Sequence, residues 1–172
     1  ILVFGSSLVL ISRNYVNIYL SYPGEFYALV TITMLAGMLL ASSSELLTAY
    51  ISLELMNFGL YVLVAYERYN IKSNEGGTKY ILLGAFSSAI VLFGISQIYG
   101  FLGVTKFVDI GAQLLVMSEM APGLVVGFVL LMAGIGFKVA LVPFHMWAPD
   151  AYEGAPLPVT AWLSVGSKIA VF

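Results

Sequence analysis

Long apolar stretches, separated by short polar segments, dominate this chain of 172 residues. A helix that crosses a lipid bilayer needs about 20 mainly apolar residues. Six stretches are candidates, and they lie at residues 1–12 (or as far as 20), 26–41, 46–66, 78–99, 123–142 (or further) and 159–172. We therefore predict an all-α fold, a polytopic transmembrane helix bundle of about six spans in one membrane domain. The first and last spans are expected to be incomplete, as in a fragment of a longer polypeptide.

The connections between these stretches differ in length and charge. The longest, residues 100–121, is expected to hold a short amphipathic helix that lies along the membrane surface. Basic residues concentrate in the first connection, with Arg13, and in the third, with Arg68 and Lys72. The positive-inside rule therefore places the first, third and fifth connections on the cytoplasmic, matrix or stromal side.

Composition strengthens the membrane assignment. Hydrophobic residues make up 60% of the chain and charged residues 9%, whereas a soluble domain has roughly 25% charged residues. The net charge of -2 gives no reason to expect nucleic acid as a partner. The chain has no cysteine, so it offers no thiolate for catalysis or for an iron–sulfur cluster. Its single histidine cannot build a zinc or haem site alone.

Glu54 lies in the middle of the expected helix at 46–66. It falls on a polar stripe with Tyr50, Asn57 and Tyr61 at helical spacing. A charge near the bilayer centre costs roughly 2.5–3.5 kcal/mol, so it persists where it is paired, hydrated or functional. Glu54 is therefore either part of a structural ion pair that holds the bundle together or a group that transfers protons.

Lys138 lies about 15 residues into the expected helix at 123–142, shortly before Pro143. Proline lacks a backbone N–H and clashes with the preceding turn, so we expect a broken helix near these residues and a freed carbonyl around Val139. Transporters place ion sites at such breaks, where protein or water covers the exposed backbone. The alternative is a lysine that snorkels beside an incidental kink, but the apolar run at 139–144 argues against it.

Two further polar side chains are candidates for proton transfer. Lys168 is expected to share a helix face with Thr160 and Ser164, whose hydroxyls can conduct protons or simply bond to helix carbonyls. His145 follows Lys138 by seven residues, two turns along if the helix resumes. Its unperturbed pKa of about 6.5 suits a proton relay. The alternative is a hydrogen bond from this histidine to a carbonyl that the proline frees.

The remaining polar features have simpler explanations. Asp150 and Glu153 are expected in a solvated loop, with a route for incoming protons as the alternative. Glu75 and Lys79, four residues apart, are expected to form a solvated pair at a helix end. Pairs of small residues spaced four apart let helices approach closely, and they occur at Gly37/Ala41, Gly84/Ser88 and Gly123/Gly127.

A buried lysine beside a mobile carboxylate can act as a proton switch. The reference pKa of lysine is about 10.4, and burial can lower it by as much as about 3–5 units. A carboxylate about 4 Å away restores about 4 kcal/mol at an effective dielectric near 20. Moving one charge across 100 mV costs about 2.3 kcal/mol, so the switch is large enough to drive transfer. We therefore hypothesise that Glu54 and Lys138 lie close together.

Several motifs resemble the antiporter-like membrane subunit 2 of the proton-pumping NADH–quinone oxidoreductase, respiratory complex I family. They are LELM (Leu53–Met56), SNEGGTKYILLGAFSSAIVLFG (Ser73–Gly94), GFKVALVPFHMWAPDAYEGAPLPV (Gly136–Val159) and SVGSKIAVF (Ser164–Phe172). The third is the most specific, because its H-x-W-x-P-D-x-Y-x-G form favours subunit 2 over other antiporter-like subunits. The same subunit also occurs in related photosynthetic complexes.

The resemblance implies an antiporter-like fold of two inverted repeats, each with a broken helix that carries a charge. This chain would cover the third to eighth helices, the first repeat plus a flanking helix. Glu54, Lys138, Lys168 and His145 match positions that the family uses for proton transfer. The second repeat's broken helix lies outside these residues.

The resemblance further implies proton translocation coupled to quinone reduction, as a subunit of a translocase enzyme. No cofactor is expected in this chain, and NADH, FMN, iron–sulfur clusters and quinone would bind partner subunits. Other membrane and hydrophilic subunits are the expected partners, in a bacterial plasma membrane, mitochondrial inner membrane or thylakoid. The alternatives are a cation/proton antiporter subunit and a non-conducting structural membrane subunit.

Overall fold

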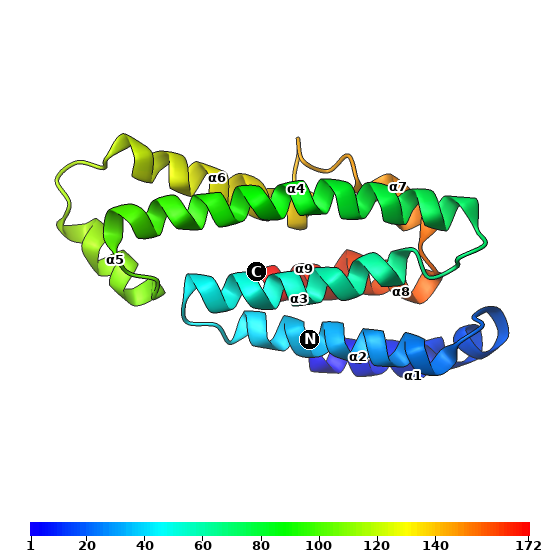
Figure 1. Ribbon diagram of the computed structural model, residues 1–172. Helices are drawn as coiled ribbons and strands as arrows, with labels where there is room; N and C mark the ends of the chain where they lie inside the picture. Colours follow the sequence, from blue (N-terminus) through cyan, green and yellow to red (C-terminus); the bar gives the residue numbers. More distant parts are fainter.

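A computed structural model describes residues 1–172 as a bundle of helices (Figure 1). The elements, in chain order, are α1 (Leu2–Tyr19), α2 (Pro23–Ala41), α3 (Leu46–Val64), α4 (Ile71–Leu102), α5 (Phe107–Val116), α6 (Pro122–Lys138), α7 (Ala148–Gly154), α8 (Leu157–Ala161), the π-helical turn η1 (Trp162–Gly166) and α9 (Ser167–Val171). The all-α prediction is confirmed. Three helices, α2, α3 and α4, are long and apolar enough to cross a membrane, and α6 and the run Leu157–Val171 are shorter apolar helices.

Helix α4 begins seven residues earlier than the sequence predicts, at Ile71 instead of residue 78. The side chain of Asn70 caps its first turn by accepting the backbone N–H of Lys72 at 3.1 Å. At the other end Gly103 adopts a left-handed φ of 69°, which a residue without a Cβ adopts freely. The result is a helix of 32 residues that runs the length of the bundle.

The expected surface helix between the fourth and fifth spans is present as α5. Its start is tied to the start of α3 by two backbone hydrogen bonds, from Leu46 N–H to Thr105 O at 2.9 Å and from Phe107 N–H to Ser44 O at 3.1 Å. The carboxylate of Glu45 accepts the hydroxyls of Thr48 and Thr105, and these bonds lower its pKa. This end of the bundle is therefore fastened by polar contacts.

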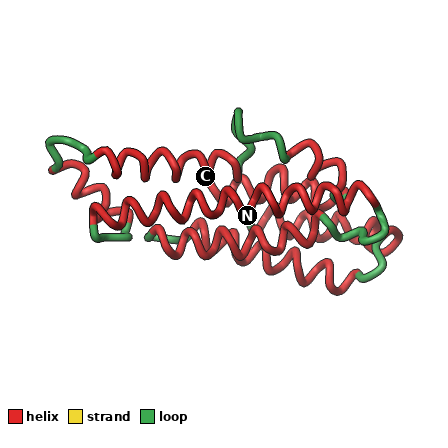
Figure 2. The backbone as a smooth tube through the Cα atoms, turned by 45° about the horizontal axis from the view of Figure 1, so that its top comes forward, coloured by secondary structure: helices red, strands yellow, loops and turns green.

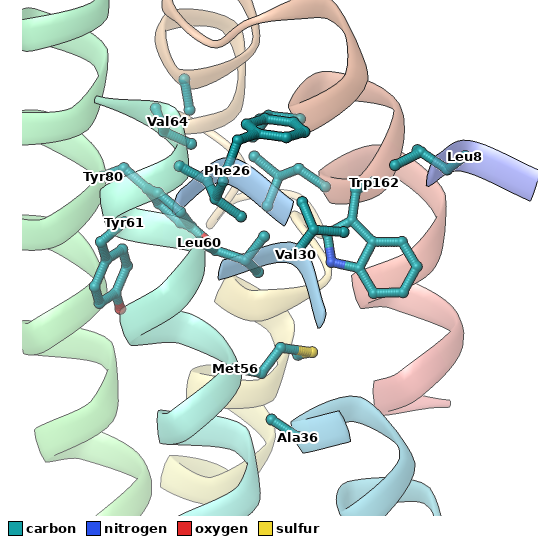
Figure 3. Packing of buried hydrophobic residues seen from close by; sticks show 14 of the residues in the cluster. Leu8, Phe26, Val30, Ala36, Met56, Leu60, Tyr61, Val64, Tyr80 and Trp162 are labelled. Carbon is teal, nitrogen blue, oxygen red and sulfur yellow. The ribbon is translucent and has the colours of Figure 1, made fainter. Parts of the chain in front are cut away.

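The helices pack in two groups. Helices α4 and α6 lie side by side, while α3 packs on α2, with α1 next to α2 (Figures 1 and 2). Tyr61 of α3 and Tyr80 of α4 lie within the main apolar core, and their ring centroids are 4.7 Å apart (Figure 3). Trp162 of η1 lies in the same core and is 1% exposed, so the last segment is part of the bundle.

Helix α6 ends at Lys138 and does not continue to Val142 as expected. Residues 139–147 form turns, and the middle of this segment projects from the bundle (Figures 1 and 2). Ala140 takes a left-handed φ of 58°, and Leu141 N–H bonds to Gly136 O at 2.8 Å. The predicted break is therefore present, but it places Lys138 at a helix end and not within a continuous helix.

The indole of Trp147 holds the broken end in place. Its Nε1–H donates to the carbonyl of Phe137 at 2.9 Å, and Trp147 is 1% exposed. The sequence predicted a freed carbonyl around Val139. The carbonyl that gains a side-chain partner is that of Phe137, two residues earlier. A buried backbone carbonyl at a helix end needs such a partner because it has no intrahelical hydrogen bond and no contact with bulk water.

Asp150 and Glu153 belong to the short helix α7, so the prediction of a loop was wrong. This helix lies against α4, where Gly76 and Gly154 allow the two backbones to approach closely. Lys79 contacts Asp150 at 2.9 Å and Glu75 at 2.6 Å, which confirms the expected Glu75–Lys79 pair. Lys72 pairs with Glu153. These ion pairs are partly exposed, so each contributes little alone, but the Lys79–Asp150 and Lys72–Glu153 pairs together fix α7 on α4.

Replacing Gly94 with alanine should destabilise the α4–α6 pair. A Cβ at Gly94 would lie 2.8 Å from both Gly127 O and Leu131 N, which are backbone atoms that cannot move independently. We expect a loss of about 1–3 kcal/mol in the free energy of unfolding, as in other overpacked interfaces. Gly100→Ala in the same helix is the control, because no atom lies within 4 Å of its Cβ position. Equal thermal stability of the two variants in detergent would contradict this account.

Replacing Trp147 with phenylalanine should cost more stability than the same change at Trp162. Both indoles are 1% exposed, but only Trp147 donates a hydrogen bond, since Trp162 Nε1 has no partner. The loss of volume is common to both variants, so the difference isolates the bond to Phe137, worth about 1 kcal/mol. Denaturation of each full-length variant in detergent gives its free energy of unfolding, and the two losses are compared. A larger loss for Trp162→Phe would show that the indole bond does not hold the break.

Candidate functional site

Three helices bring one polar side chain each to a common point. Lys138 ends α6, Glu54 lies in α3 and Ser88 lies in α4. The ammonium Nζ of Lys138 is 3.6 Å from Glu54 Oε1 and donates to Ser88 Oγ at 2.9 Å. The hydroxyl of Ser88 is 2.7 Å from the same Glu54 oxygen. The structure therefore brings together Glu54 and Lys138, as hypothesised, and adds Ser88; we call these three residues the Glu54–Ser88–Lys138 site.

The site is buried. The side chain of Lys138 is 3% exposed and that of Glu54 is 16% exposed. Asn57, one turn along α3, donates its amide to Glu54 Oε1 at 3.3 Å. A lysine placed this deep cannot snorkel to the surface, so its charge depends on these partners.

The end of α6 suits a positive charge. The last carbonyls of a helix carry partial negative charge, which favours a cation in the final turn. The ring of Phe137 adds a cation–π contact, with its centroid 5.8 Å from Lys138 Nζ. The carbonyl of Gly84 is a further acceptor, 3.5 Å from Lys138 Nζ. A larger residue would not fit at position 84, because a Cβ there would lie 2.2 Å from the hydroxyl oxygen of Tyr61.

Sequence reasoning missed Ser88. The Gly84/Ser88 pair was predicted to serve helix packing only, yet Ser88 Oγ contacts both charged members of the site. A hydroxyl in a transmembrane helix is common, and its spacing from Gly84 fits packing equally well. The only feature of the sequence that could have indicated a role for Ser88 is its hydroxyl. The packing of α3, α4 and α6 decides which groups that hydroxyl contacts.

His145 does not lie two turns beyond Lys138 on a resumed helix, because the chain between them is irregular. The residue is partly buried, and its Nδ1 atom is buried without a hydrogen-bond partner. The expected bond to a freed carbonyl is therefore not made by this nitrogen. Its role in proton transfer remains a prediction.

Lys168 lies apart from the Glu54–Ser88–Lys138 site. It is half-buried, with its ammonium 5.8 Å from the ring centroid of Tyr152. The hydroxyls of Thr160 and Ser164 bond to backbone carbonyls at 3.2 Å and 3.1 Å, as in the simpler of the two interpretations. The π-helical turn η1 also lies between Thr160 and Lys168, so the expected four-residue spacing along one face is altered.

Aromatic rings connect the surroundings of the two lysines. Phe137, beside Lys138, lies 5.4 Å from Trp147 between ring centroids, and Trp147 lies 6.1 Å from Tyr152, beside Lys168. Tyr80 stacks on Trp147 at 4.6 Å. The hydroxyl of Tyr152 is buried without a hydrogen-bond partner. The direct contacts between the two lysine environments are therefore aromatic and not ionic.

Comparison with known proteins places this chain in a family. The family described as NADH:quinone oxidoreductase/Mrp antiporter, TM, matches residues 43–172. The chain is 48% identical to NADH-quinone oxidoreductase subunit N of Desulfitobacterium hafniense over 171 residues, which cover 99% of this chain and 34% of that protein. It is also 48% identical to subunit N of Moorella thermoacetica over 161 residues, which cover 94% and 34%.

A solved structure agrees with the sequence comparison. A chain of respiratory complex I from Thermus thermophilus with bound aureothin superposes with a TM-score of 0.78 and 35% identity, over 98% of this chain and 38% of that one. This chain spans about a third of the length of the curated relatives it matches. It belongs to the NADH:quinone oxidoreductase/Mrp antiporter transmembrane family and is an integral membrane protein.

Proposed function

We propose that this chain is the proton-transferring part of a membrane subunit of an NADH–quinone oxidoreductase. The observation that carries the proposal is the buried contact between Glu54 and Lys138, at 3.6 Å, beside the break that ends α6. A membrane protein that only needed packing at this point could place two apolar side chains there at no desolvation cost. Ionisable groups inside a membrane bundle are expensive and commonly lie on ion pathways.

The separation of the two charges sets how firmly the lysine holds its proton. At about 4 Å and an effective dielectric near 20, a carboxylate favours the charged lysine by about 4 kcal/mol. A movement of Glu54 or of the C-terminal end of α6 that separates them removes this energy. The change exceeds the roughly 2.3 kcal/mol needed to move one charge across 100 mV. Opening and closing of the pair can therefore load and release a proton.

The onward path is proposed to lead through His145 to Lys168. Both lie on the segments that follow the break, and the buried Nδ1 of His145 and hydroxyl of Tyr152 have no protein partner. Buried polar atoms of this kind are usually satisfied by ordered water, which also conducts protons. Lys168 lies 5.8 Å above the ring of Tyr152, so water at that hydroxyl would be near it.

The wider assignment follows from the relatives. We propose that the chain forms the first inverted repeat and a flanking helix of subunit N, assembled with other membrane subunits and with hydrophilic subunits. NADH, FMN, iron–sulfur clusters and quinone are proposed to bind those partners. The α1–α2, α3–α4 and α6–α8 connections are proposed to face the cytoplasm, matrix or stroma. The family description also names Mrp antiporters, so cation/proton antiport is the second candidate.

Replacing Lys138 or Glu54 with alanine in the full-length subunit should strongly reduce proton pumping by the assembled complex. Each variant removes one charge of the buried pair, and we expect a loss of about tenfold or more, since positioned proton-transfer groups contribute 10²–10⁴-fold. Lys106→Ala is the control, because this lysine is exposed and outside the site. Pumping and NADH–quinone activity are measured in proteoliposomes.

The outcomes separate the candidates. Full pumping by the Lys138→Ala and Glu54→Ala complexes would overturn the proposal and favour a structural role for the pair. Transport that requires sodium ions, lost in the same variants, would favour the cation/proton antiporter. Failure to copurify with hydrophilic redox subunits would count against the assignment to the oxidoreductase.

Single cysteines should report the sidedness, because the chain has none of its own. Tyr69, in the α3–α4 connection, is 100% exposed, and Glu119, in the α5–α6 connection, is also exposed. With Tyr69→Cys in a cysteine-free subunit, we expect labelling by an impermeant maleimide from the cytoplasmic side only. Glu119→Cys should label from the opposite side only. The reverse pattern would invert the proposed orientation.

A further inference from the structure

Lys138 and Glu54 are close, yet they are not hydrogen-bonded to each other. Their nitrogen and oxygen atoms are 3.6 Å apart, whereas N–H···O hydrogen bonds measure about 2.7–3.2 Å. The two contacts through Ser88 are within bonding range, at 2.9 Å from Lys138 Nζ and 2.7 Å to Glu54 Oε1. A proton that leaves the lysine therefore has a continuous hydrogen-bonded path only through the serine.

We propose that Ser88 is a catalytic relay, through which the proton passes between Lys138 and Glu54; the inference rests on the proposed function. In the forward step an N–H bond of the ammonium breaks and a new O–H bond forms on Ser88. At the same time the original O–H bond of Ser88 breaks and a new one forms on Glu54. The products are a neutral amine, an intact serine hydroxyl and a neutral carboxylic acid, so atoms and charge balance.

The hydroxyl also has a second acceptor, which lets it interrupt the path. Ser88 Oγ lies 2.9 Å from the carbonyl oxygen of Gly84, one turn earlier in α4. A serine hydroxyl has one proton and cannot donate to both oxygens at once. When the hydroxyl donates to Glu54, the proton path is continuous. When the hydroxyl rotates to donate to the Gly84 carbonyl, the path is interrupted. Bonds from serine to the carbonyl four residues earlier are common in helices, so this alternative is readily available.

The neighbouring Ser87 shows what a structural hydroxyl looks like in the same helix. It is 2% exposed, against 6% for Ser88, and it donates across the α4–α6 interface to Gly134 O at 3.1 Å. No hydrogen bond or ion pair joins it to Glu54 or Lys138. Ser87 therefore provides a matched control, a buried hydroxyl on α4 that contacts α6 outside the relay.

The first experiment compares Ser88→Ala with Ser87→Ala in the full-length subunit within the assembled complex. Neither variant adds bulk, so both should assemble. We expect Ser88→Ala to slow proton pumping by about tenfold or more, in line with the contribution of positioned proton-transfer groups. Ser87→Ala should pump at the wild-type rate with lower thermal stability. The ratio of pumping rates in H₂O and D₂O should change for Ser88→Ala only.

The second experiment tests for the hydroxyl itself. Threonine and valine have the same shape, but only threonine carries a hydroxyl, so Ser88→Thr should pump and Ser88→Val should not. Pumping by Ser88→Val at the same substantial rate as Ser88→Thr, or wild-type pumping by Ser88→Ala, would overturn the relay. If the added methyl inactivates both, the comparison of Ser88→Ala with Ser87→Ala decides. If the Glu54→Ala and Lys138→Ala complexes do not pump but the Ser88→Ala complex pumps normally, only the relay is overturned. If all three variant complexes pump normally, the proposed function is overturned as well.

Discussion

The cost of burying a charge governs how this bundle is arranged. Lys138 is almost fully enclosed, so an acidic partner and hydrogen-bond acceptors must meet it at the same depth. Glu54 comes from α3, and Ser88 and the Gly84 carbonyl come from α4. These groups can converge only if three helices pack closely at one level. Small residues at the α4–α6 contact make that possible, because a side chain at Gly94 would strike the facing backbone.

The same requirement explains why α6 ends where it does. A helix that stops inside a bundle leaves carbonyls that water cannot reach, so the protein must supply partners for them. Trp147 supplies one, by its bond to Phe137 O, and it directly precedes the first residue of α7. Helix α7 is in turn fixed to α4 by the pairs of Lys79 with Asp150 and of Lys72 with Glu153. Polar contacts near one end of the bundle therefore help to keep the broken helix in register with the buried charges.

The sequence predicted the apolar helices from their long hydrophobic runs, and it singled out Glu54 and Lys138 because charges are conspicuous within such runs. The sequence was less informative where tertiary contacts determine the length of a helix or the partners of a side chain. Residues 71–77 are too polar to predict as part of a span, but their pairing with α7 extends α4 to include them. The sequence left open whether a helix resumes between Lys138 and His145, because resumption after a proline depends on packing that spacing does not encode; the structure shows turns there. Ser88 was assigned to packing because a hydroxyl fits a helix interface whether or not it contacts a charge.

Lys138 is buried and Lys168 is half-buried, and their different surroundings constrain the proposed path between them. Lys138 is paired with a carboxylate, whereas Lys168 lies over the ring of Tyr152. The rings of Phe137, Trp147 and Tyr152 follow one another between these environments and offer no continuous chain of hydrogen bonds. Leaving Tyr152 Oη and His145 Nδ1 buried without partners would cost about 1–3 kcal/mol for each atom. Hydration of these two atoms would remove that cost and provide the missing polar steps. For the proposed path, the arrangement favours conduction only when water reaches the aromatic segment, which would keep the two lysines from exchanging protons continuously.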